Sequence, residues 1–133
     1  AVVCAPNEPT VAVAGYFLTE LKSRSMPCAG VLMNQMHPTL GRSIDPSAVL
    51  RSLSEEHADD LDQDTVNQFI ARIKINHRRL TGLSTAEQGL AASLHPMLEP
   101  HQSLWQIPRL EGEVHDIEAL GRVFERVQVA VPS

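Results

Sequence analysis

The sequence predicts an α/β fold with a partial parallel sheet of about three strands and flanking helices. Short, nearly continuous apolar runs occupy residues 1–4, 28–33 and 103–107, and such runs are typical of strands buried in a parallel sheet. The segments between these runs carry apolar residues at helical spacing. Strands that alternate with helices in this way indicate α/β layers.

Composition narrows the class of protein. The 133 residues, 43% hydrophobic and 20% charged, match one soluble globular domain. The formal net charge of −5 argues against a nucleic-acid partner, because phosphate binding needs a basic surface. No apolar stretch approaches the ~20 residues that span a bilayer. Cys4 and Cys28 are too few for a disulfide framework and are interpreted as buried free thiols, which favours the cytoplasm.

Residues 1–38 are predicted to form a β-α-β unit. Asn7 is placed to cap a helix in which Pro9 occupies the first turn, and this helix is expected to end near Arg24. The second strand should run from Cys28 to Met33 and end at Asn34, where polarity returns abruptly.

Residues 39–102 are predicted to be a helical segment. A short acidic helix is expected over 46–56 and a longer one over 66–80. Thr81-Gly82 should interrupt this second helix, because glycine disfavours helical backbone. The sequence of residues 84–87, Ser-Thr-Ala-Glu, has the form of a capping box, so a new helix is expected to begin there and to end before His95-Pro96.

Residues 103–133 are predicted to supply a strand, a loop and the final helix. The strand spans 103–107, and an exposed loop follows over 108–113. Asp116 is expected to cap the last helix, whose apolar stripe ends at Val127.

The start of the chain suggests a portion of a larger α/β domain. The sequence begins without Met and inside an apolar run, and three strands are few for a parallel sheet that must be covered on both faces. The strand over residues 1–4 is therefore expected to lie at a sheet edge or to pair with another chain.

Ligands of open parallel sheets bind outside the carboxyl ends of the strands. Three predicted segments lie there, at residues 5–8, 34–38 and 108–113. Asn34 is the candidate binding residue, because its amide offers both a donor and an acceptor to the edge of a purine; the alternative is that it merely ends a strand. The chain has no P-loop, no nucleophile motif and no histidine pair spaced for zinc, so no metal site is expected.

Two segments resemble the ArsA-type ATPases, the P-loop enzymes that include arsenite-pump ATPases and ATPases that target tail-anchored membrane proteins. Residues 32–38, Leu-Met-Asn-Gln-Met-His-Pro, are similar to that family's "VNQ/VNR…P" motif. Residues 107–116, Ile-Pro-Arg-Leu-Glu-Gly-Glu-Val-His-Asp, resemble its proline loop before the final helix. The resemblance implies that residues 1–133 are a single C-terminal fragment of such an ATPase domain, the C-terminal part of a P-loop NTPase fold.

The resemblance also implies a site. Asn34, with Gln35 beside it in the motif, would contact adenine, and the loop residues Pro108, Arg109 and Leu110 would offer backbone groups to the edge of the base. The P-loop and the catalytic residues would lie upstream, so this chain alone is expected to be catalytically inactive. ATP with Mg²⁺ would be the cofactor of the parent ATPase.

Two functions remain open at this point. The first is the adenine-contacting portion of an anion-transporting or targeting ATPase, with ATP or ADP, a second copy or its own N-terminal part, and a membrane protein as expected partners. The second is a non-enzymatic interaction module that retains the fold, with the acidic helices of residues 46–98 as its partner surface. A zinc-linked dimer is not implied, because residues 39–60 contain no cysteine.

Overall fold

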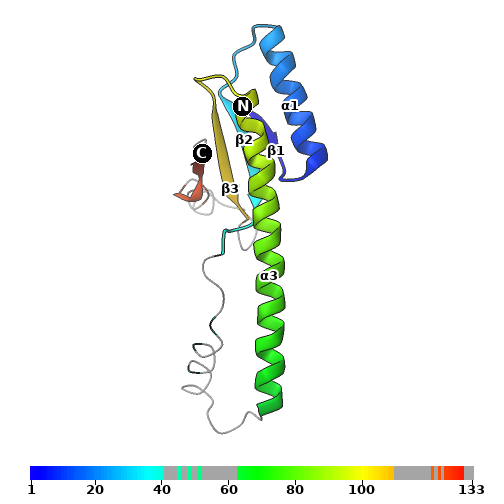
Figure 1. Ribbon diagram of the computed structural model, residues 1–133. Helices are drawn as coiled ribbons and strands as arrows, with labels where there is room; N and C mark the ends of the chain where they lie inside the picture. Colours follow the sequence, from blue (N-terminus) through cyan, green and yellow to red (C-terminus); the bar gives the residue numbers. More distant parts are fainter. Residues whose placement is uncertain are drawn as a thin grey trace. The chain divides into compact units, whose positions relative to one another are not determined.

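A computed structural model describes residues 1–40, 45, 48, 51, 63–109, 121, 123 and 125–130 (Figure 1). Its sheet has the order β1-β2-β3-β4. The strands are β1 (Val2–Cys4), β2 (Gly30–Met36), β3 (Ser103–Pro108) and β4 (Gln128–Ala130). The first three strands are mutually parallel and β4 is antiparallel to β3. The predicted α/β class and the three parallel strands are therefore confirmed, and β1 lies at an edge as expected.

Helix α1 (Glu8–Ser23) joins β1 to β2 and starts as the sequence predicts. The side chain of Asn7 accepts a hydrogen bond from the backbone N–H of Thr10 at 3.1 Å, which satisfies one of the free donors at a helix start. Val11, Ala14 and Leu18 recur at spacings of three and four residues and are buried. Helical periodicity thus places one apolar face of α1 against the core.

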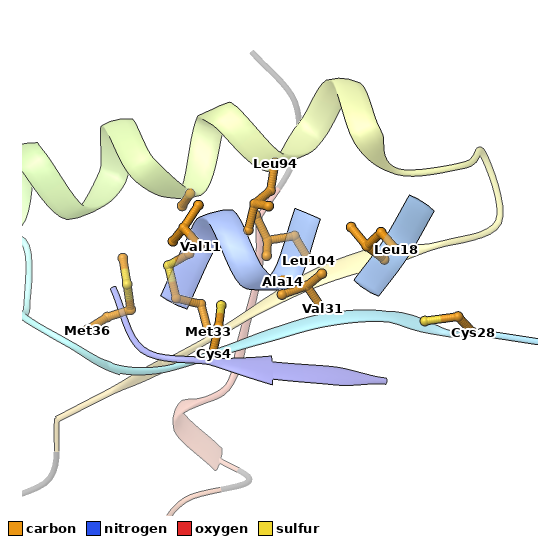
Figure 2. Close-up of a cluster of buried hydrophobic side chains, with 11 residues drawn as sticks. Cys4, Val11, Ala14, Leu18, Cys28, Val31, Met33, Met36, Leu94 and Leu104 are labelled. Carbon is orange, nitrogen blue, oxygen red and sulfur yellow. The ribbon is translucent and has the colours of Figure 1, made fainter. Parts of the chain in front are cut away.

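The core lies between one face of the sheet and the helices. Figure 2 shows side chains of α1 and Leu94 gathered against Val31, Met33 and Leu104 of the strands. Val31 and Leu104 occupy paired positions of β2 and β3. Burial of such side chains stabilises the fold by roughly 1.5–3 kcal/mol each.

The prediction of two helices over residues 66–94 was wrong, because α3 (Gln63–Leu94) is continuous. Gly82 lies in its interior, where a single glycine costs only about 1 kcal/mol relative to alanine. Glu87 does not cap a helix start; its carboxylate bonds to His37 instead. The helix ends where predicted, at a 3-10 turn over His95–Met97 that contains Pro96.

Two strand predictions also need correction. Strand β2 continues past Asn34 to Met36, with a register irregularity between Met33 and Met36. The last helix does not extend to Val127: residues 125 and 126 are helical, and β4 begins at Gln128. A three-residue strand is too short to show a period of its own.

Several predicted features fall partly outside the described residues. Of the helix expected over 46–56, only Ala48 and Arg51 are described, and both are helical. The loop residues after Arg109 and the start of the last helix at Asp116 lie outside the described part of the chain.

The chain divides into two compact units. Unit 1 comprises residues 1–38 and 84–133, and unit 2 comprises residues 39–83. Every residue of the core cluster belongs to unit 1. Among the described residues, no helix is long and apolar enough to cross a membrane.

Candidate functional site

A groove runs along the free edge of β1 and the first turns of α1. We call it the β1–α1 groove; its volume is about 660 Å³. It is lined by Val2, Val3, Cys4, Ala5, Pro9, Thr10, Val13, Ala14, Phe17, Asn34 and Gln35. All of these residues belong to unit 1, and none of them is Lys, Arg, His, Asp or Glu. The groove is thus apolar along its length, with two amides from β2.

The irregular end of β2 positions these amides. Gln35 has a φ of 64°, a left-handed conformation that is uncommon for a residue with a side chain. The Asn34 side chain accepts a hydrogen bond from the Gln35 backbone N–H at 2.9 Å. This bond orients the exposed Asn34 amide and leaves its NH₂ group as a donor. A local backbone outlier at a strand's carboxyl end is a frequent feature of binding sites.

The structure brings only some of the expected site residues together. Asn34 and Gln35 line the β1–α1 groove, whereas Pro108 and Arg109 do not. Pro108 is in register with Met36, and the Arg109 backbone N–H donates to the Met36 carbonyl at 2.7 Å. Since β2 lies between β1 and β3, the proline segment is attached to the opposite side of the strand that carries Asn34. Leu110 lies outside the described residues.

Sequence reasoning missed a carboxylate–histidine pair next to this site. One oxygen of Glu87 accepts from the His37 backbone N–H at 2.6 Å, and the other lies 2.6 Å from His37 Nδ1. The Glu87 side chain is only 9% exposed. These two contacts attach His37, which directly follows β2, to α3. The only sequence signal was a histidine directly before Pro38, and nothing indicated its partner 50 positions away.

A second missed contact joins α3 to β3. Gln88 and Gln106 exchange two amide hydrogen bonds, each 3.1 Å long. Gln106 is buried on the core face of β3, where an unpaired amide would be unfavourable. The two hydrogen bonds give the buried Gln106 amide its partners. They also attach β3 to the turn of α3 whose Glu87 bonds to His37.

The thiol of Cys4 contributes an apolar surface to the groove. Burial raises the pKa of the Cys4 thiol above its ordinary value, because desolvation disfavours the thiolate. Both cysteines are free and buried, as predicted. The described residues contain no group of three or more His, Cys, Asp or Glu side chains arranged to hold a metal ion.

The lining suits an uncharged, largely apolar ligand with a polar edge. Ligand sites are commonly clefts of about 300–1,000 Å³ with mostly apolar walls and a few polar groups that fix orientation. Comparison with protein-family models and with curated proteins finds no match for this chain.

Proposed function

We propose that this chain is the adenine-contacting C-terminal portion of an ArsA-type ATPase with a P-loop NTPase fold. One observation carries the proposal: Asn34 and Gln35 stand at the carboxyl-terminal end of a parallel strand and at the end of an apolar groove. Ligands of open α/β sheets bind at this edge.

The chemistry of the groove suits a purine base. The apolar lining, which includes Phe17 and Val13, offers surface for the faces of a ring. The Asn34 amide provides its NH₂ group as a donor, and the oxygen that accepts from the Gln35 backbone N–H has a second lone pair. Asparagine pairs with the N6 and N7 positions of adenine through these two groups. The faces of the base would therefore contact the apolar lining, and its polar edge would meet the Asn34 amide.

The phosphates of ATP would be held elsewhere. Among the described residues, no lysine or arginine lines the β1–α1 groove, and the sequence has no P-loop. In this proposal the upstream part of the parent ATPase supplies the P-loop and the groups that bind Mg²⁺. The isolated 133 residues would then hydrolyse no ATP.

The sheet surface supports a larger parent domain. Val3, Leu32, Trp105 and Val129 are in register across all four strands and lie on the face away from the core. Val3 is 65% exposed and Val129 58% exposed. Parallel sheets are generally covered on both faces, so further protein covering this face fits the proposal. A second copy, the N-terminal part and a membrane-protein client are its expected partners.

The test is base discrimination by the full-length protein. Asn34→Asp replaces the amide donor with an acceptor, and the preference for ATP over GTP should fall by about 5–150-fold, which corresponds to roughly 1–3 kcal/mol. Asn7→Asp is the matched control, because aspartate caps a helix as well as asparagine does. Unchanged discrimination in the Asn34 variant, measured by equilibrium nucleotide binding, would rule out the adenine assignment.

The alternative is a non-enzymatic interaction module. It is favoured by the exposed apolar side chains of α3, among them Phe69, Ile75 and Leu83. The coding sequence upstream of residue 1 distinguishes the two proposed functions. A Gly-Lys-Gly-Gly-x-Gly-Lys type loop there supports the ATPase, and a chain without one supports the module.

A further inference from the structure

The middle of α3 is cationic although the chain as a whole is acidic. Residues 65–86 contain no Asp or Glu, and four of the chain's eleven basic residues fall within residues 72–79. The chain's formal net charge is −5. This segment therefore carries a run of positive charge that the net charge of the chain does not reveal.

Apolar and cationic side chains alternate along one side of this helix. Residues three or four positions apart share a helix face, and such spacings connect Phe69, Arg72, Ile75, Arg79 and Leu83. We call these five residues the cationic ridge. Phe69, Ile75 and Leu83 are 45%, 65% and 40% exposed, and both arginines are exposed.

A different stripe of the helix faces inward. Val66, Ile73 and His77 are half-buried and Ile70 is buried, and these residues also follow one another at spacings of three and four. The cationic ridge is thus not the side that α3 uses for packing within unit 2. Three large apolar side chains therefore lie exposed on this one ridge.

Within the part of the chain that the structure describes, the arginines of the ridge form no ion pair. The four ion pairs within the described residues involve neither Arg72 nor Arg79. Lys74 and Arg78, on the adjoining face, form none there either. An acidic ligand would therefore gain attraction without displacing any ion pair between described residues.

We propose that the cationic ridge binds an acidic amphipathic helix of a partner protein. Leucine-type side chains of such a helix would contact Phe69, Ile75 and Leu83, and its carboxylates would pair with Arg72 and Arg79. Helix recognition of this kind is read through anchors at i, i+3, i+4 and i+7. A lipid surface is disfavoured, because membrane-surface helices separate their apolar and cationic faces, whereas here the arginines stand between the apolar residues.

The probe is a synthetic helical peptide of about 18 residues in which Leu and Glu alternate along one stripe, to match the alternation of apolar and cationic side chains on the ridge. Its binding to the full chain, measured by fluorescence anisotropy at about 50 mM salt, should weaken by at least about tenfold in Arg72→Glu/Arg79→Glu. Lys22→Glu/Arg126→Glu changes the net charge equally and should bind as the unmodified chain does. Far-UV circular dichroism checks that each variant keeps its helix content.

A charge swap makes the test specific. A peptide with Lys in place of Glu should bind Arg72→Glu/Arg79→Glu more tightly than it binds the unmodified chain. Ile75→Ser should weaken the acidic peptide several-fold through the lost apolar contact. Equal binding by the ridge and control variants overturns the proposal. It is equally overturned if the peptide does not bind while vesicles of phosphatidylcholine and phosphatidylserine do, which would assign the ridge to a lipid surface.

Discussion

Glu87 is the residue whose contacts connect the end of β2 to α3. Its two oxygens bond to the His37 backbone N–H and to His37 Nδ1, both at 2.6 Å. A hydrogen-bond donor left unpaired in a buried setting costs about 1–3 kcal/mol. Glu87→Ala should lower the free energy of unfolding by about this amount in urea titrations, and Glu87→Gln should lower it less, because its amide oxygen can still accept from the backbone.

The matched control for that variant is Glu125→Ala, since Glu125 is exposed in the described part of the chain. Surface substitutions of this kind usually change stability by less than about 0.5 kcal/mol. Equal effects of Glu87→Ala and Glu125→Ala would contradict the structural role given to the His37 contact.

Cys4 should make stability depend on pH in the alkaline range. Burial raises the pKa of this thiol, so the folded state keeps its proton to a higher pH than the unfolded state does. The contribution of the protonated Cys4 thiol to the free energy of unfolding is fully present below the thiol's pKa in the unfolded chain, about 8.5. It is lost as the pH rises through the thiol's higher pKa in the folded chain. Urea titrations from neutral to alkaline pH should show a steeper decline for the unmodified chain than for Cys4→Ala. Parallel declines would mean that the thiol does not contribute.

At the scale of single residues, the sequence predicted those whose signal is local. Asn7 as a helix cap and Asn34 at the end of a strand follow from the residues next to them. The His37–Glu87 pair does not, because its partners are 50 positions apart. Moreover, Glu87 stands in a capping-box pattern that local reasoning assigns to a helix start. Whether Asn34 reads a base remains a proposal that the Asn34→Asp experiment tests.

At the scale of elements, two glycines should respond in opposite ways to alanine. Gly82 is in the interior of α3 with no other atom near the position of an added Cβ. Gly82→Ala should therefore stabilise the chain by about 0.5–1 kcal/mol. Gly30 has a φ of 136°, and an added Cβ would overlap the Ser103 backbone. Gly30→Ala should destabilise by more than Gly82→Ala stabilises, because strand β2 would have to move away from β3.

Thermal unfolding of both glycine variants, followed by circular dichroism, provides the measurement. A Gly82→Ala variant of unchanged or lower Tm would indicate that residues 81–83 are not stably helical, in agreement with the break that the sequence predicted. The prediction failed here because glycine's cost in a helix is small compared with the contacts on either side of it. Tertiary packing, such as that of the buried Leu94, outweighs it.

At the scale of the whole molecule, the order of apolar segments was sufficient to predict the α/β class. The three parallel strands could be predicted because strands of a parallel sheet are apolar along their whole length and need no alternation of apolar and polar residues. Strand β4 could not be predicted, because its residues Gln128–Ala130 directly follow the apolar stripe of the expected last helix and carry no strand signal of their own. Only pairing with β3, which is formed 20 or more residues earlier in the chain, makes them a strand.

The division into two units yields a last prediction, that unit 1 folds without unit 2. All residues of the core cluster lie in residues 1–38 and 84–133. The two cut ends lie near each other, because Glu87 contacts the His37 backbone at 2.6 Å and Ser84 is one helical turn away from Glu87. A Gly/Ser linker of about six residues, which spans up to ~20 Å, should therefore replace residues 39–83. The shortened chain should unfold cooperatively in urea, keep its strand signal in circular dichroism and lose binding of the acidic peptide. A broad, non-cooperative transition would show instead that unit 1 depends on the segment removed.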